Sequence, residues 1–159
     1  MNRPAPIDLS QARRPTLARR LASILYDSIV VGGLMLFAAA LVVIPLGLGI
    51  GQQEWERLQQ TWQMHLALRA LLLAVMIGFH LGFWTHGGQS LGMRAWRLRV
   101  VRWDGEPLRL RDALIRYAAA WLSALVFGLG FLWSLWDRDG YTWHDRLSQT
   151  RLVMLRYDR

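Results

Sequence analysis

Long runs of apolar residues dominate the sequence and alternate with short polar segments. Residues 21–50 form the first run, in which Asp27 is the only charged side chain. Residues 64–84 form the second run, which contains three basic or titratable side chains, His65, Arg69 and His80. A helix needs roughly 20 apolar residues to cross a bilayer. The pattern therefore predicts two transmembrane helices, over about residues 20–48 and 64–84.

A third apolar run, residues 113–136, can be interpreted in two ways. It is long enough to cross the membrane once more. The sequence Gly128-Leu129-Gly130 can instead break it into a re-entrant helix and a short return, which is tolerated where the backbone is buried in protein. With the two runs before it, this segment forms a predicted membrane domain over residues 19–159.

Three polar segments lie outside the apolar runs. Residues 1–18 contain three prolines and predict a mostly disordered tail. Residues 52–63 form a short linker whose Trp55 and Trp62 suit a membrane interface. Residues 85–112 form a strongly basic loop. In each of these segments the composition is too polar for a further span.

Within the basic loop, apolar and basic residues alternate over residues 96–101, which predicts a short strand. Asp104-Gly105 predicts a turn, and residues 108–110 a returning strand. Residues 151–155 are a third strand candidate. We therefore expect an all-α membrane protein with two full transmembrane helices, a third membrane-embedded helical segment and a small cytoplasmic β-hairpin.

The distribution of positive charge predicts the orientation. All nineteen basic residues of the 159 are arginine, and the formal net charge is +8. A basic chain with long apolar runs indicates a membrane protein and not a nucleic-acid binder, since such arginines gather in loops that face the cytoplasm. The N-terminus and the loop are therefore expected in the cytoplasm of a bacterial cell, with the protein in its inner membrane. The residues expected to contact anionic lipid head groups are Arg94, Arg97, Arg99 and Arg102.

The side of the C-terminus depends on the third apolar run. A full span places the C-terminus outside, whereas the five arginines that follow residue 136 indicate the cytoplasm. A cytoplasmic C-terminus is favoured, and the alternative stays open.

Asp27 is the residue most in need of a partner. It follows Arg20 by seven residues, so both lie on one helix face, with Asp27 about 10 Å deeper. A carboxylate there costs roughly 2.5–3.5 kcal/mol unless it is paired, hydrated or protonated. Arg116 is the first expected partner and His80 the second. Asp27 is then either an ion or proton site, with His80 as a possible relay, or one half of a buried pair that fixes helix packing.

Enzyme chemistry has little support in the sequence. The chain contains no cysteine, and its four histidines lack metal-ligand spacing. The glycine-rich residues 87–92 lack the lysine of a phosphate-binding loop. The His144-Asp145 pair has no nucleophile at the spacing of a known catalytic motif. We therefore predict no catalytic activity, no metal and no cofactor.

Four segments, in order, resemble the RDD family of bacterial membrane proteins. They are residues 19–27, with an arginine at the head of a helix and an aspartate inside it, Gly88-Gln89-Ser90-Leu91-Gly92-Met93-Arg94, residues 98–101, and residues 144–153. The family often has lysine where this chain has Met93. The resemblance implies that Arg20, Asp27 and Asp145 are the residues that give the family its name.

The resemblance also implies a function, because the family has a suggested part in transport. We expect transport of an ion or small solute. Three apolar segments are too few to enclose a wide pathway, so a homo-oligomer or a membrane partner is expected, with Gly32, Gly33 and residues 38–40 permitting close helix packing. The alternative is a non-transporting adaptor whose basic loop and tail bind a cytoplasmic partner or anionic lipid.

Overall fold

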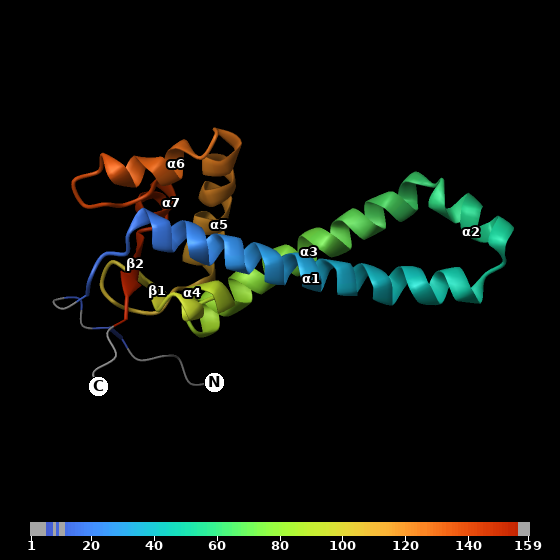
Figure 1. Cartoon of the computed structure of the whole chain (residues 1–159), viewed down its shortest axis with the longest axis horizontal. Coiled ribbons are helices and arrows are strands. Elements are labelled where there is room, and N and C mark those ends of the chain that lie inside the picture. Colours follow the sequence, from blue (N-terminus) through green and yellow to red (C-terminus); the bar gives the residue numbers. More distant parts are fainter. Residues whose placement is uncertain (1–5, 8, 10–11, 156–159) are drawn as a thin grey trace. The chain divides into compact units, whose positions relative to one another are not determined.

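The computed structural model describes residues 6–7, 9 and 12–155. The chain is mostly helical and divides into two compact units, one formed by the described residues up to Asp27 and from His80 onward, the other by residues 28–79 (Figure 1). The elements, in order, are α1 (Leu17–Gly49), α2 (Gln52–Gln59), α3 (Trp62–His86), α4 (Leu91–Ala95), β1 (Leu98–Arg102), α5 (Leu110–Leu125), α6 (Leu129–Leu132), η1 (Trp133–Leu135), α7 (Trp143–Leu147) and β2 (Thr150–Met154).

Helices α1 and α3 confirm the two predicted membrane spans. They contain 33 and 25 residues, and their most apolar windows have mean hydropathies of 2.7 and 2.0. At about 1.5 Å per residue, both exceed the roughly 30 Å of a bilayer core. Only 6% of each window is buried within the protein, which suits helices whose apolar sides face lipid. Each is therefore long and apolar enough to cross a membrane.

The linker between the two long helices contains an element that the sequence did not predict. Helix α2 is polar, and none of its residues is buried. Gly51 precedes it in an extended conformation, and Glu54 pairs with Arg57 one turn later at 3.1 Å. Such i,i+3 pairs add only a few tenths of a kcal/mol to a helix. An eight-residue polar helix has no apolar period, so pattern analysis could not distinguish it from a loop.

The third apolar run is helical but sharply bent. Helices α5 and α6–η1 meet at an angle of 108° across a three-residue break. Phe127 and Gly128 at the break both have positive φ, 57° and 76°. The predicted interruption near Gly128 is therefore confirmed, and glycine suits it because a left-handed backbone costs it no steric strain.

The two-stranded sheet forms, but its pairing differs from the predicted hairpin. Strand β1 pairs antiparallel with β2, from Leu98 opposite Met154 to Arg102 opposite Thr150. The turn at Gly105 is present, with φ 86° and a hydrogen bond from its N–H to the Arg102 carbonyl. The predicted strand at residues 108–110 is wrong.

Helix α5 begins in place of that returning strand. The Asp112 carboxylate accepts the backbone N–H of Arg109 at 3.1 Å, which caps the first turn of the helix. Pro107 just before it lacks the N–H that a central ladder position needs. Leu108 therefore packs into the core, and the third strand candidate, near the C-terminus, becomes the partner of β1.

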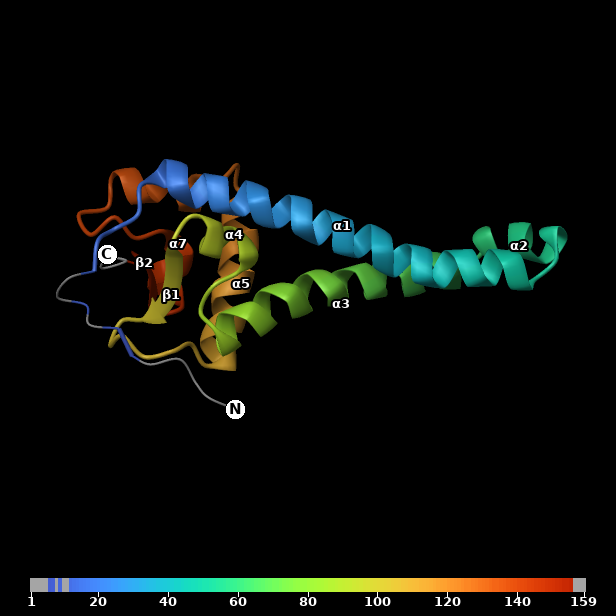
Figure 2. The same cartoon turned by 60° about the horizontal axis from the view of Figure 1, so that its bottom comes forward.

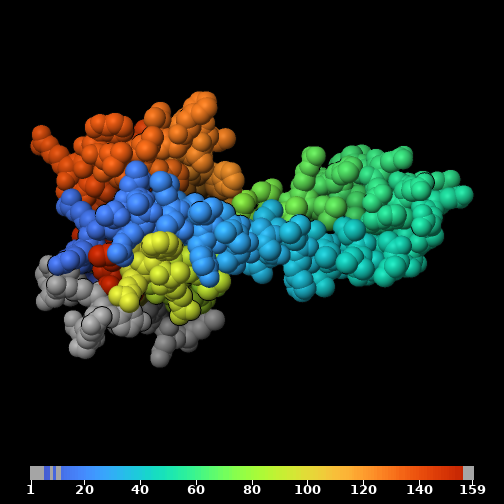
Figure 3. All heavy atoms as spheres, in the orientation of Figure 1, coloured from blue at the N-terminus to red at the C-terminus, as the bar shows by residue number. Residues whose placement is uncertain are grey.

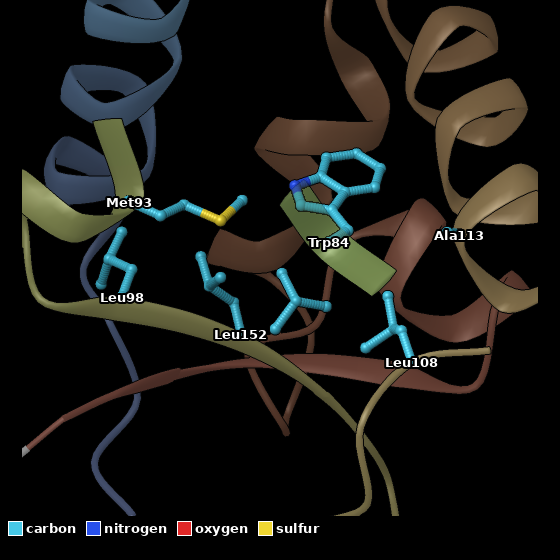
Figure 4. Close-up of a cluster of buried hydrophobic side chains, with 7 residues drawn as sticks. Trp84, Met93, Leu98, Leu108, Ala113 and Leu152 are labelled. Carbon is cyan, nitrogen blue, oxygen red and sulfur yellow. The ribbon is translucent and has the colours of Figure 1, made fainter. Parts of the chain in front are cut away.

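The apolar core of the first unit is small and lies between the sheet and the helices (Figures 2 and 4). Strand β1 contributes Leu98 and Val100, and β2 contributes Leu152. Trp84 from α3 packs against them, as do the remaining members, Met93, Leu108 and Ala113. This core holds together segments that are far apart in the sequence.

The predicted disordered tail, residues 1–18, lies partly outside the described residues. Where it is described, it makes contacts that differ from that prediction. The Ile7 N–H donates to the Gly105 carbonyl at 3.1 Å, and Arg13 forms a bridge with Met154. Helix α1 also begins within it, at Leu17. The backbone of the sheet supplies these partners, and the composition of the tail could not reveal them.

Candidate functional site

Five ionisable side chains are buried inside the first unit. Each is at most 6% exposed, and they come from α1, α5 and α7: Arg20, Asp27, Arg116, His144 and Asp145. Isolated buried charges are strongly unfavourable, so each must be compensated by partners. The cluster combines two arginines, two aspartates and one histidine.

Asp145 lies between the two buried arginines. Its Oδ2 accepts a hydrogen bond from Arg20 Nη1 at 2.8 Å, and its Oδ1 accepts one from Arg116 Nη1 at 2.5 Å. The same carboxylate caps α7, because Oδ2 also accepts the N–H of Thr142 at 3.2 Å. Charge-assisted bonds of this kind are about twice as strong as neutral ones. Asp145 is therefore a fixed junction of three helices.

The pKa of Asp145 follows from these contacts. Burial alone would raise the pKa of the carboxyl, but Arg116, with smaller contributions from His144 and Arg20, holds it well below its ordinary value. The carboxyl group therefore stays charged throughout the physiological range of pH.

Each arginine of this triad has a further partner. Arg116 Nη1 donates to Thr150 Oγ1 at 2.8 Å, and its guanidinium lies 5.6 Å from the centre of the Trp84 ring. Arg20 Nη2 donates to the Gly140 carbonyl at 3.2 Å. The prediction that Arg116 pairs with Asp27 is therefore wrong. Asp145 takes that position, because pairing of β2 with β1 returns α7 to the start of α5.

Asp27 is held by neutral donors. Ser90 Oγ donates a short hydrogen bond to Asp27 Oδ2, and the backbone N–H of Gly92 donates to Oδ1 at 2.8 Å. A Cβ at Gly92 would lie 2.9 Å from Asp27 Cγ and would overlap the Ser23 carbonyl oxygen. Only glycine allows this approach. Among the described residues, Asp27 forms no ion pair.

His80, the second expected partner of Asp27, lies in an aromatic cluster. Its ring centre is 5.5 Å from that of Trp84 and 5.6 Å from that of Tyr117. Tyr117 in turn contacts Trp121, one turn further along α5. These contacts connect the end of α3 to α5, and the oxygens of Asp27 are occupied by Ser90 and Gly92 instead.

His144 is buried next to Asp145. Its Nε2 lies 4.0 Å from Asp145 Oδ1, and its ring packs against Phe131 at 4.9 Å. Burial, and then the positive charge of Arg116, lower the pKa of His144 to about 3. His144 is therefore neutral at neutral pH and adds no positive charge to the triad.

We expect acid to destabilise the protein through His144. An unfolded histidine takes up a proton near pH 6.5, whereas the folded one does so only near its pKa of about 3. Stability should therefore fall as the pH drops from about 6.5 toward 3. Thermal unfolding of the detergent-solubilised protein across this range measures the effect. His144→Leu should flatten the slope, and an unchanged slope in that variant would contradict the assignment.

The four arginines predicted to contact lipid have different environments. Arg94 and Arg97 are exposed. Arg99 is half-buried, and Arg102 pairs with Asp104 at 3.1 Å and with Asp112 at 3.5 Å. Arg94 and Arg97 are thus the two most exposed residues of the four.

The cluster offers little to a multivalent metal. Across residues 12–155 and the few described before them, no three His, Asp or Glu side chains are grouped so as to hold one. A monovalent cation does not require such a group of three ligating side chains. The oxygens that could hold it are those of Asp27 and the hydroxyl of Ser90.

Sequence reasoning missed several uncharged members of the site. Ser90, Gly92, Thr142 and Thr150 supply donors and acceptors to the two aspartates and to Arg116. One signal was available, because Thr142 and Asp145 are spaced as in a capping box. Ser90 and Gly92 lie inside a quoted motif, but only the fold shows that their partner is Asp27.

Together, the fold and the cluster define a helical membrane protein with a buried cluster of acidic and basic side chains. The sequence profile of the RDD family matches residues 14–149, which is most of the chain. The chain therefore belongs to the RDD family, as its motifs predicted. No curated protein and no solved structure was found to match it.

Proposed function

We propose that this protein transports a monovalent cation across a membrane in exchange for a proton, with Asp27 as the ion-exchanging carboxylate. The observation that carries the proposal is the difference between the two buried aspartates. Asp145 is compensated by two arginines, whereas the hydrogen bonds that Asp27 accepts from described residues come from a hydroxyl and a backbone N–H.

This difference has a direct chemical consequence. A carboxylate between two arginines gains little from a further cation, because its charge is already neutralised. Asp27 lies ten residues into α1, about 15 Å along the helix. A carboxylate without a counter-charge inside a transmembrane helix is costly. A proton or a small cation relieves that cost, and oxygen ligands such as the Ser90 hydroxyl suit hard cations.

The triad of Arg20, Asp145 and Arg116 serves as the rigid support of this site. Arg20 and Asp27 share one face of α1, so a fixed Arg20 also fixes the rotation of the helix that carries Asp27. Ser90, which caps the N-terminus of α4, and Gly92 within α4 then approach Asp27. In this division of roles, Asp145 maintains the geometry and Asp27 exchanges the ion.

The proposed location is the bacterial inner membrane. Helices α1 and α3 form its two crossings, with the N-terminus and the basic loop in the cytoplasm and α2 on the outer side. The support is the arginine content of the loop and tail, as the positive-inside rule requires.

A homo-oligomer encloses the pathway in this proposal, since two long helices are too few to do so. Helix α1 provides a surface for close packing, because a Cβ added at Gly32 or Gly33 would meet nothing within 4 Å. Small residues let helix backbones approach closely in membranes.

The experiment is a flux assay on the purified full chain in proteoliposomes. An imposed sodium gradient should drive proton movement, which a trapped pH-sensitive dye reports, and protein-free liposomes set the background. Potassium and lithium gradients define the selectivity. If folded protein gives only background flux with all three cations, exchange is excluded as the function.

That outcome would favour a second candidate, a non-transporting adaptor. Its support is the exposure of Arg94 and Arg97 on the loop, where they can contact anionic lipid head groups or an acidic partner. Arg94→Gln with Arg97→Gln should then weaken partner or lipid binding, whereas Asp27→Asn should not.

A further inference from the structure

We infer that residues 110–135 form a re-entrant hairpin, which enters and leaves the membrane on the face that carries the β-sheet and contacts the acyl chains of that leaflet. The composition of this segment is compatible either with a full crossing of the membrane or with a return of the chain to the side from which it entered. It does not depend on transport at Asp27.

The first argument is that both flanks of the segment are bound to each other. Strand β1 precedes α5, and β2 follows α7, yet the two strands are paired along their full five residues. The ladder continues beyond them, since the Trp103 N–H donates to the Gln149 carbonyl at 3.1 Å. Two strands of one sheet lie on one side of a membrane, so the chain between them returns to the side it left.

Side-chain hydrogen bonds also connect the start of α5 to α7 and β2, which follow the hairpin. Arg116, in the second turn of α5, bonds Asp145 of α7 at 2.5 Å and Thr150 of β2 at 2.8 Å. All three residues are buried. The start of α5 and the chain that follows the hairpin are therefore in direct contact.

The lengths of α5 and of α6 with η1 agree with a chain that returns to the side of the membrane from which it entered. Helix α5 has 16 residues, which gives about 24 Å. Helix α6 with η1 adds seven residues, about 10 Å, after a bend of 108°. A bilayer core is about 30 Å thick, so α5 is too short to cross it and the second arm is much shorter.

The bend satisfies the demands that a membrane makes on irregular backbone. Polar backbone groups at such depth must find partners inside the protein. The Gly128 N–H donates to the Ser123 carbonyl at 2.9 Å, and the Phe131 N–H donates to the Gly128 carbonyl at 2.9 Å. Gly130 packs so closely that an added Cβ would overlap Ser123 and lie 3.0 Å from the Trp143 ring. The fold-back is thus a close-packed, hydrogen-bonded turn.

Lipid is the partner that fits the outer surface of the hairpin. Phe127 at its tip is 95% exposed, and further large apolar side chains along the segment and at its end are exposed as well: Leu122, Leu125, Leu129, Leu135 and Trp136. Figure 3 shows this segment (orange) at the surface of the first unit. So many exposed apolar side chains cannot remain in water. The same unit contains the first eleven residues of α1, a helix long and apolar enough to cross the membrane, so the acyl layer is within reach.

The chain has no cysteine, which makes site-directed labelling a clean test. The variants Arg111→Cys and Arg138→Cys place single thiols in the first turn of α5 and just after the hairpin, both at exposed positions. Gln53→Cys in α2 marks the opposite face, and Phe127→Cys marks the tip. Each full-length variant is treated with a membrane-impermeant maleimide in intact cells and in inverted vesicles.

We expect Arg111→Cys and Arg138→Cys to be labelled from the same face, and Gln53→Cys from the other. Phe127→Cys should resist the reagent from both faces until detergent is added, which also proves that its thiol is reactive. Labelling of Arg138→Cys on the Gln53→Cys side would establish a full span and overturn the inference. Rapid labelling of Phe127→Cys in membranes would place the tip in water and overturn the lipid contact.

Discussion

Replacing Asp145 with asparagine should lower the free energy of unfolding by about 3–5 kcal/mol, the largest stability loss expected from one side chain here. Asp145 is fully buried and is the carboxylate paired with both Arg20 and Arg116, so its loss leaves two buried arginines without this ion pair. The measurement is thermal unfolding of the detergent-solubilised protein, followed by the fluorescence of its nine tryptophans.

Asp139→Asn is the matched control for this change. Its side chain is 52% exposed, and its ion pairs with Arg14 and Arg146 are both 3.5 Å long. Exposed pairs contribute at most about 1 kcal/mol, so this variant should unfold almost as the parent does. Adding Arg116→Met to Asp145→Asn should recover part of the loss, because one uncompensated charge disappears. Equal stabilities of Asp145→Asn and Asp139→Asn would show that the triad does not hold the fold.

Replacing Asp27 with asparagine should reduce sodium-driven proton flux to the level of protein-free liposomes. Asparagine nearly preserves the shape of aspartate and can still accept the hydrogen bond from Ser90, but it can neither bind a proton nor neutralise a cation. Its cost in stability should stay near 1–3 kcal/mol, less than for Asp145→Asn. Flux per folded chain, in proteoliposomes of equal protein content, is the quantity to compare.

Two controls distinguish transport from folding in this experiment. Asp27→Glu keeps the exchangeable carboxylate and should retain part of the flux, whereas Asp139→Asn should retain all of it. If Asp27→Asn inserts, folds and still moves protons at the parent rate, Asp27 has a structural role only.

The helices were predictable because their signal is local. Apolar runs of sufficient length predict α1 and α3 without reference to any other part of the chain. The break near Gly128 was equally local, since glycine tolerates the left-handed backbone found there. Whether the bent segment crosses the membrane could not be decided in this way, because the answer depends on where its flanks meet.

The pairing of the strands was predicted less well for the same reason. A turn at Asp104-Gly105 suggested that the next residues return as a strand. The partner of β1 instead lies about fifty residues later in the chain. Pairing at such separation depends on the packing of Leu98, Val100 and Leu152 into one core, which sequence periodicity does not contain.

The candidate site was predicted in its charged members and mispredicted in its pairing. The resemblance to the family marked Arg20, Asp27 and Asp145, and all three are buried in the structure. The partner of Asp27 was sought among charges, yet the fold supplied a serine hydroxyl and a backbone N–H. Neutral hydrogen-bond donors cannot be recognised from the pattern of charged residues. The different partners of Asp27 and Asp145 are therefore known only from the structure.

In the proposed mechanism Asp27, and not Asp145, exchanges a proton for a cation. The most direct measurement is the release of protons from purified protein in weakly buffered detergent solution when sodium chloride is added, with choline chloride as the ionic-strength control. The account predicts saturable, sodium-dependent release from the parent protein and none from folded Asp27→Asn. Equal release from both proteins, or none from the folded parent, would contradict it.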